Sequence, residues 1–326
     1  MMEYPLLQRV MINGSDIHIE HIIDGAYIET CDLSGPKLIL NIDDEHTIYR
    51  DEVGIEASGI VEVEFADPDG RGDEVWIDTF IIVTAPSQNA VVTVNAIQTD
   101  CHQLKQPAKH PRFYVDQAPA DILADLLPGL VVDADTIDVF GTYHLNPGMT
   151  PARLLRDMAR DYAALIWLNR GTVYFRLLDS LPGLKTSWHF ERGNHEADVT
   201  IAKYALMSDS ALYDRITHKS YIQWDTVAGL ERSETHADEG DVYISVPFYS
   251  ALNNQSRFLM PFMVTEMLGN GQFEPGRKVE VSFHRLSHSD SPLDESIPAD
   301  QYIQQVTHYQ RGSRYLCKTE LGVMHD

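Results

Sequence analysis

The chain has 326 residues, of which 44% are hydrophobic and 9% aromatic, so it can form sizeable cores and is not a disordered chain. Its net charge of −24 argues against sequence-reading nucleic-acid binding, which needs a basic face. No apolar run approaches the roughly 18–20 residues that cross a bilayer, and the first residues lack a signal-peptide pattern, so we expect neither membrane insertion nor secretion. Three widely spaced cysteines, Cys31, Cys101 and Cys317, indicate a reducing compartment without disulfide bonds.

The negative charge is concentrated at the start of the chain. Residues 1–100 hold 20 acidic and 4 basic side chains, a net charge of −16, whereas residues 101–200 carry −2 and residues 201–326 carry −6. Such a surface keeps a protein soluble, and it also repels phosphate groups. The first hundred residues therefore form either an ordinary acidic surface or one past which DNA moves without sticking.

The first hundred residues are predicted to be β-structure. Asn13-Gly14 between two apolar runs predicts a hairpin, and the composition of residues 67–70 predicts another turn. The alternation in residues 58–65 leaves their inner face undecided. Without any helix of useful length, the pattern favours an antiparallel sandwich or barrel of at least five strands, which include residues 17–20, 36–41, 58–65, 76–84 and 90–98.

The middle block, residues 113–178, lies between two segments of predicted β-structure. One helix is predicted to begin at Pro119, because proline has no N–H to lose at a helix start. A second helix is predicted after Thr150, a favourable N-cap, with Pro151 in the first helical position. A hairpin is expected in residues 164–177. The block is therefore predicted to be a small α+β module.

The last segment returns to predicted strands. The apolar stretch 253–268 is the exception: it is predicted to be partly helical, with Pro261 interrupting or starting the helix. It either packs in a core, which is the favoured interpretation, or covers a partner. A polar turn is expected at 238–241. The predicted strands are residues 213–224, 241–247, 277–283, 301–310 and 314–323.

Histidine spacing offers two candidate metal sites, and the sequence disfavours both. His284 and His288, with Asp290, would share a helix face, but the local pattern is a strand that runs into a Ser-rich loop. His18 and His21 lie three apart on a predicted strand and so would point to opposite faces. The sequence has neither a Gly-rich phosphate loop nor a Gly-x-Ser-x-Gly motif. We therefore expect no metal and no cofactor.

Neighbouring carboxylates are a further candidate for chemistry. Paired carboxylates are the groups that acid–base cleavage of sugars uses. An acidic segment also places many carboxylates in solvated loops, and this is the favoured explanation here. The groups concerned are Asp43-Asp44-Glu45 and Asp51-Glu52.

A basic stripe is predicted on the second helix of the middle block. Arg153, Arg156 and Arg160 recur at helical spacing and so share one face. This face is either simply solvated, or it meets the carboxylates of a neighbouring subunit in an acidic oligomer.

Three ordered segments carry a resemblance to a known family. The first is MTPARLLRDMA at 149–159, followed by ALIW at 164–167 and VYFR at 173–176. The second is FEPGRKVEV at 273–281, a strand that begins after Pro-Gly. The third is a closing strand pair, YIQQVTH at 302–308 and YLCKTELG at 315–322. In this order the segments resemble the baseplate hub proteins of contractile phage tails and related injection machines, the late-control tail protein group.

The resemblance implies a β-rich α+β fold, with two tube-like antiparallel β-barrels and a small α+β module between them. The first barrel would be residues 1–105. The module of helix, helix and hairpin would be residues 106–205. The second barrel would be residues 206–326, with an inserted segment at about 225–275. The stretch 253–268 departs from the family, in which the corresponding segment is more Ala-rich.

The resemblance also implies a structural role without catalysis. Three subunits with two barrels each would present six barrels to the six-fold tail tube and seat the three-fold central spike. The implied partners are two further copies of this chain, the tail tube protein, the spike protein and neighbouring baseplate proteins. The implied location is the virion tail baseplate, after assembly in the host cytoplasm.

In such a hub, DNA is only a non-specific passenger during ejection. An acidic inner wall would line its channel and prevent sticking by like-charge repulsion. The candidate lining residues are Asp43, Asp44, Glu45, Asp51, Glu52, Glu62 and Glu64.

Two alternative functions stay open. One is a hexameric tail-tube or distal-tail ring protein, which the oligomeric state distinguishes from a trimer. The other is an enzyme that cleaves carbohydrate or peptidoglycan with an acidic pair. Replacement of Asp43, Asp44 and Asp51 would abolish the activity of such an enzyme.

Overall fold

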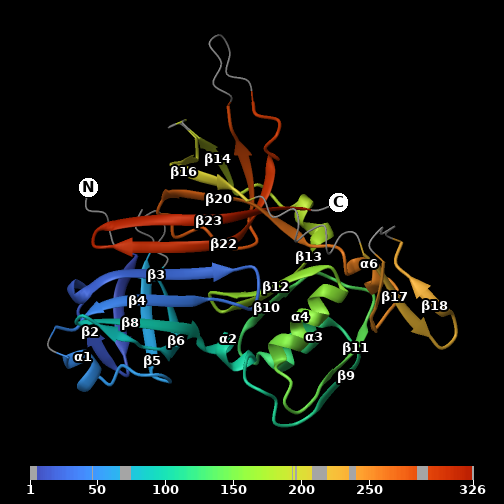
Figure 1. Ribbon diagram of the computed structural model, residues 1–326, viewed down its shortest axis with the longest axis horizontal. Helices are drawn as coiled ribbons and strands as arrows, with labels where there is room; N and C mark the ends of the chain where they lie inside the picture. The colour runs from blue at the N-terminus through green and yellow to red at the C-terminus, as the bar shows by residue number, and fades with distance from the viewer. Residues whose placement is uncertain are drawn as a thin grey trace.

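Figure 1 shows the computed structural model, in which strands from both ends of the chain lie together and a mixed α+β module lies beside them. The structure describes residues 6–45, 47–66, 75–192, 194, 197–207, 219–234, 240–284 and 293–324. The predicted turn at 67–70, parts of 213–224 and 238–241, His288 and Asp290 lie outside these ranges. The predicted β-rich α+β class is confirmed. No helix in the described ranges is long and apolar enough to cross a membrane.

The N-terminal segment consists of antiparallel strands and very short helices. Asn13 and Gly14 both have positive φ, 50° and 81°, and join the first two strands in the predicted hairpin. Val61, Val63 and Phe65 settle the inner face of the fifth strand, because all three are fully buried. The elements are β1 (Leu7–Ile12), β2 (Ser15–Ile17), η1 (Ile19–His21), β3 (Ile22–Thr30), β4 (Lys37–Asp43), α1 (Ile48–Asp51), β5 (Ile60–Ala66), β6 (Val75–Thr84), β7 (Ser87–Gln88), β8 (Val91–Gln98) and α2 (Thr99–Leu104).

The middle module has a core of its own. Helices α3 (Pro119–Leu126) and α4 (Pro151–Asp161) begin where the sequence predicts. The Thr150 hydroxyl accepts a hydrogen bond from the Arg153 backbone N–H at 3.3 Å, so it caps α4. The apolar faces of both helices pack against the strands of the module. The other elements are β9 (Arg112–Gln117), β10 (Val131–Ala134), β11 (Gly141–Leu145), the predicted hairpin β12 (Ala164–Asn169) and β13 (Thr172–Leu177), and η2 (Leu178–Gly183).

The C-terminal segment corrects one prediction. Only α6 (Ala251–Asn254) is helical in the apolar stretch, and β20 (Leu259–Leu268) is a strand. Alternate residues of β20 are buried, and Pro261 is accommodated at a register shift against the last strand. The other elements are β14 (Trp188–Arg192), β15 (Val199–Ile201), β16 (Lys203–Leu206), β17 (Ser220–Asp225), β18 (Gly229–Arg232), β19 (Asp241–Tyr243), β21 (Lys278–Ser282), β22 (Asp300–Arg311) and β23 (Arg314–Met324).

The two ends of the chain form one hydrogen-bonded sheet. Strand β3 pairs on one side with β4 and on the other with β22, antiparallel in both cases. A single apolar core runs beneath strands from both segments, from Leu7 in β1 to Leu321 in β23. The middle module is thus attached beside a sheet that the N-terminal and C-terminal strands build together (Figure 1).

Candidate functional site

The seven predicted channel-lining carboxylates fall into two groups. Glu62 and Glu64 lie on the outer face of β5. In the antiparallel pairing of β5 with β1, Glu64 stands opposite Arg9. The other five lie at the end of β4 and around α1. Of these, Asp43, Glu45, Asp51 and Glu52 are exposed and Asp44 is buried.

Asp44 has a structural task. Its side chain is only 5% exposed, and its two carboxylate oxygens accept hydrogen bonds from the backbone N–H groups of Tyr49 at 2.9 Å and Arg50 at 3.1 Å. These bonds satisfy amide groups at the start of the α1 turn. Asp44 therefore stabilises the fold and is not available to a channel surface. An acidic catalytic pair at Asp43-Asp44 also loses one of its members.

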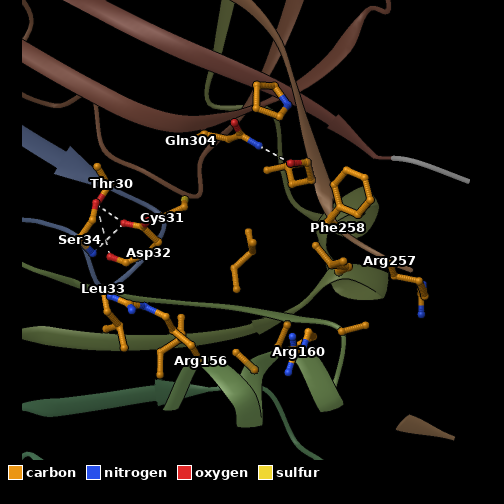
Figure 2. A pocket seen from close by; sticks show the side chains of 18 of the residues that line it. Thr30, Cys31, Asp32, Leu33, Ser34, Arg156, Arg160, Arg257, Phe258 and Gln304 are labelled. Carbon is orange, nitrogen blue, oxygen red and sulfur yellow. Dashed lines mark hydrogen bonds between the residues drawn. The ribbon is translucent and has the colours of Figure 1, made fainter. Parts of the chain in front are cut away.

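The predicted arginine stripe lies on the exposed face of α4. Asp157, on the same helix, is shared by two of its members: its carboxylate lies 3.9 Å from Arg153 Nε and 3.3 Å from Arg160 Nη2. Arg156 and Arg160 also line a cleft of about 520 Å³ between α4 and the sheet. Figure 2 shows the cleft, with the segment after β3 on one side and Phe258 on the other.

The segment after β3 forms a polar wall of this cleft. Asp32 Oδ1 accepts hydrogen bonds from the Ser34 N–H and the Thr30 hydroxyl, both at 2.8 Å. Burial opposes ionisation of Asp32, but the bonds from Ser34 and Thr30 lower the pKa of its carboxyl group. Next to it, burial raises the pKa of the Cys31 thiol, so this cysteine stays protonated.

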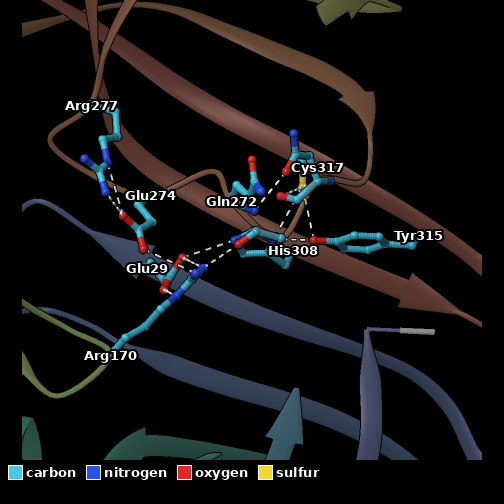
Figure 3. A network of polar contacts seen from close by, with 10 residues as sticks. Glu29, Arg170, Gln272, Glu274, Arg277, His308, Tyr315 and Cys317 are labelled. Carbon is cyan, nitrogen blue, oxygen red and sulfur yellow. Dashed lines mark hydrogen bonds and ion pairs between the residues drawn. The ribbon is translucent and has the colours of Figure 1, made fainter. Parts of the chain in front are cut away.

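A buried polar network lies where the middle module meets the sheet (Figure 3). Arg170, in the turn between β12 and β13, contacts Glu29 of β3 with its Nε at 3.1 Å. Its guanidinium also donates to the Gly271 carbonyl at 2.8 Å, lies 3.2 Å from Glu274, and stacks 4.1 Å from the centre of a Trp76 ring. One side chain of the module is therefore held by three segments of the sheet side.

His308 of β22 continues the network into the core. Its Nε2 lies 3.1 Å from Glu29, its Nδ1 lies 2.6 Å from the Tyr315 hydroxyl, and Cys317 Sγ lies 3.4 Å from the same Nδ1. Burial opposes protonation of the imidazole, but Cys317 and Glu29 raise the pKa of His308 to about 9. Burial likewise opposes ionisation of Glu29, whose pKa is nevertheless lowered by Arg170 and His308. Glu29 is therefore a carboxylate between two cations.

This buried network contributes to the stability of the fold. The side chains of Glu29 and His308 are both 0% exposed, and Cys317 is also buried, so no substrate reaches them. Sequence reasoning placed Arg170 only in a turn and His308 only in a closing strand. Their partner Glu29 is 141 and 279 residues away, respectively, and local patterns contain no signal for contacts of that range.

The structure corrects the placement of His18 and His21. His18 and His21 do not lie on one strand: Ile19–His21 is a 3-10 turn, so their rings are neighbours with centres 5.7 Å apart. His284 lies 3.0 Å from Glu191. Within the described ranges, no three His, Cys, Asp or Glu side chains are grouped as metal ligands would be.

Comparisons with known proteins give a consistent fold. The structure is similar to a tail protein from Neisseria meningitidis, with a TM-score of 0.67, 13% identity, and coverage of 98% of this chain and 97% of the other. It is similar to the 43 kDa tail protein of prophage MuSo2 from Shewanella oneidensis, with a TM-score of 0.66, 11% identity, and coverage of 99% and 100%.

A third similar structure is a type VI secretion system component from E. coli, with a TM-score of 0.53, 11% identity, and coverage of 97% of this chain and 77% of the other. No protein-family model and no curated protein sequence matches the chain. At these identities the likeness concerns structure alone. The chain therefore has the fold of phage tail proteins over its whole length.

Proposed function

We propose that the protein is a structural baseplate hub, a homotrimer that joins the six-fold tail tube to the three-fold central spike. The observation that carries this proposal is the structural likeness to two tail proteins, which covers at least 97% of this chain and of each of the two tail proteins. The arrangement of two β segments around one α+β module supports it further, since a hub needs two tube-like units per subunit. The protein would act without catalysis in the virion tail baseplate, after assembly in the host cytoplasm.

The tube-like units would be residues 1–105 and 206–326, with 106–205 between them and an insert at about 225–275. Since β14–β16 and β20 lie in the same sheet as β21–β23, the second unit would also include these strands. Strand β3 pairs with β22, so the two units would share an edge within one subunit. Side-by-side placement of two such units is what converts three subunits into six positions. The partners would be the tail tube, the spike and adjacent baseplate proteins.

The channel wall is proposed from the carboxylates that remain once Asp44 is set aside, all of them exposed except Glu64, which is half-buried. Their charge would keep DNA moving as a passenger, because like charges repel at short range in a narrow pore. The set is Asp43, Glu45, Asp51, Glu52, Glu62 and Glu64.

The oligomeric state tests the hub directly. Native mass spectrometry of the purified chain, and of the chain mixed with its tail tube and spike proteins, is expected to give a trimer of the 36.8 kDa subunit. A hexamer would instead favour a tail-tube or distal-tail ring protein and would overturn the hub.

Genome ejection tests the channel separately. Replacing Glu62 and Glu64 with lysine is expected to slow ejection while particles still assemble, because DNA would then bind the wall. The matched control places the same two charges at the exposed Asp121 and Asp138 of the module. If ejection from the Glu62/Glu64 variant is as fast as from the wild type, the lumen assignment is wrong and the hub itself is untouched.

A further inference from the structure

The three-stranded sheet of the middle module has two different faces. In the order β10-β13-β12, Val173 and Phe175 of β13 point into the module core. The opposite face carries Trp167, Tyr174 and Arg176, and it forms one wall of a cleft of about 640 Å³. The other wall comes from segments 184–188 and 274–278 of the sheet side. A cleft of this size between two packed units is typical of a ligand site.

Three aromatic side chains, those of Trp167, Tyr174 and Trp188, line the cleft. The rings of Trp167 and Tyr174 are stacked, with centres 4.8 Å apart and planes inclined by 12°. Gly276 allows the opposite segment to approach this wall: its φ is +80°, and a Cβ there would lie 2.5 Å from the Trp167 ring. Trp188 is half-buried and borders the same space. The Trp167 indole N–H, which is buried in this wall, has no hydrogen-bond partner in the described structure.

The cleft has four basic side chains, and three of them are ion-paired: Arg176 with Asp133 and Asp135, Arg277 with Glu274, and Lys278 with Asp300. Lys185 is exposed and has no ion pair among the described residues. It is therefore the cation that favours an anionic group in this cleft.

The inner end of the cleft already holds a carboxylate. Glu274 lies 3.2 Å from Arg170 and 2.6 Å from Arg277, so two arginines bind one acidic group there. A second hollow of about 250 Å³ shares Trp188, Glu274 and Arg277 with the cleft and extends it to Arg170. Arginine forks recognise carboxylate and phosphate groups with defined geometry.

We propose that this cleft binds an anionic saccharide, with a sugar ring against Trp188 and its carboxylate or phosphate beside Lys185 and Arg277. The apolar face of a sugar ring packs on an aromatic ring, and its hydroxyls bond to polar groups at the rim such as Gln272 and Ser187. A stretched acidic peptide fits less well, because β13 is paired on both sides and offers no free backbone edge to such a chain. The proposal stands apart from the hub assignment.

Binding of defined probes tests the proposal on the full-length protein. Tetragalacturonate is titrated in low salt, with tryptophan fluorescence and saturation-transfer NMR as readouts. Neutral maltotetraose and the acidic peptide tetraglutamate are titrated in parallel. Tetragalacturonate is expected to bind saturably and to weaken as salt is raised, while the other two bind at least about tenfold more weakly.

Variants locate the site. Trp188→Ala is expected to weaken tetragalacturonate binding about tenfold, and Lys185→Gln several-fold. Lys203→Gln, the same change at an exposed lysine of β16, is expected to bind like the wild type. Lys185 is exposed, so its variant keeps the test valid even where Trp188→Ala reduces folding.

Three results would overturn the proposal. Equal binding of maltotetraose would remove the anionic requirement, and equal binding of tetraglutamate without dependence on Trp188 would indicate a peptide site. Absence of saturable tetragalacturonate binding up to about 10 mM would exclude a saccharide site altogether.

Discussion

Two groups of ion pairs in this protein have similar N–O distances but differ in their exposure to solvent: the pairs around Glu29 and the pairs around Asp157 on α4. The Arg170 side chain is 14% exposed and its partner Glu29 is fully buried, whereas Arg153 and Arg160 on α4 are 75% and 59% exposed beside Asp157. Water screens the pairs on α4, so each contributes little to stability. In the buried network around Glu29, loss of Arg170 leaves the carboxylate fully buried with His308 as its remaining cationic partner. Burial, not the distance between charges, therefore decides which pair the fold depends on.

Arg170→Ala is expected to have the largest effect. Removal of this guanidinium takes one cationic partner from the buried Glu29 and one from Glu274, and the free energy of unfolding should fall by about 3–5 kcal/mol. Urea denaturation followed by circular dichroism measures this change. Arg153→Ala is the matched control and should stay within about 0.5 kcal/mol of the wild type. If Arg170→Ala and Arg153→Ala lower the free energy of unfolding equally, burial does not decide which ion pair the fold depends on.

Asp44→Ala sharpens the comparison among carboxylates. Its loss leaves two amide groups at the α1 turn without their acceptor, and the free energy of unfolding should fall by about 1–3 kcal/mol. The exposed neighbours Asp43 and Glu45, each changed to alanine, should shift stability by less than about 0.5 kcal/mol. The same denaturation assay separates them. If Asp44→Ala leaves the free energy of unfolding unchanged, Asp44 has no structural role and belongs again with the candidate channel-lining carboxylates.

The pH dependence of stability isolates His308. Its pKa is about 9 in the folded protein and 6.5 in an ordinary environment, so the folded state binds the proton more tightly. The contribution to stability is therefore complete below pH 6.5 and is lost as the pH rises through 9. The groups that face the imidazole are Glu29, Tyr27, Tyr315 and Cys317.

The measurement compares the wild type with His308→Gln at pH 6.5 and pH 10. The wild type should lose more stability across this interval than the variant, by roughly 3 kcal/mol for the full shift in pKa. Burial also raises the pKa of Asp78 to about 7, which lowers stability as the pH rises, but it does so in both proteins and cancels in the difference. Equal slopes would show that His308 is already neutral at pH 6.5.

The α4 stripe should show the smallest effect on folding. Changing Arg153, Arg156 and Arg160 to glutamine together should alter the free energy of unfolding by less than about 1.5 kcal/mol, because all three are exposed. If the protein forms the proposed trimer and the stripe meets a neighbouring subunit, the same variant shifts the oligomer towards monomer in mass photometry. The control is Arg112→Gln, which removes another exposed ion pair. An unchanged oligomeric state would leave the stripe as a solvated face.

Local signals in the sequence predicted local structure well. Asn13-Gly14 and Thr150-Pro151 act within a few residues, and both produced the expected hairpin and helix start. The prediction of partial helix for the stretch that contains Leu259–Leu268 was wrong. This segment is a strand because it pairs with β16 and β23, which are distant in sequence. The network around Glu29 and the burial of Asp44 could not be predicted, because each depends on which distant segments the fold brings together.

The pairing of β3 with β22 has a consequence for how the chain is made. Ile28 pairs with Thr307, so this edge of β3 has no partner until about 280 further residues have been translated. At typical rates of synthesis the wait is roughly 15–55 s, during which an unpaired strand edge is open to aggregation. Completion of the sheet therefore waits for the synthesis of β22. Truncated chains that lack β22 would expose the unpaired edge of β3, which chaperones would have to bind to prevent aggregation.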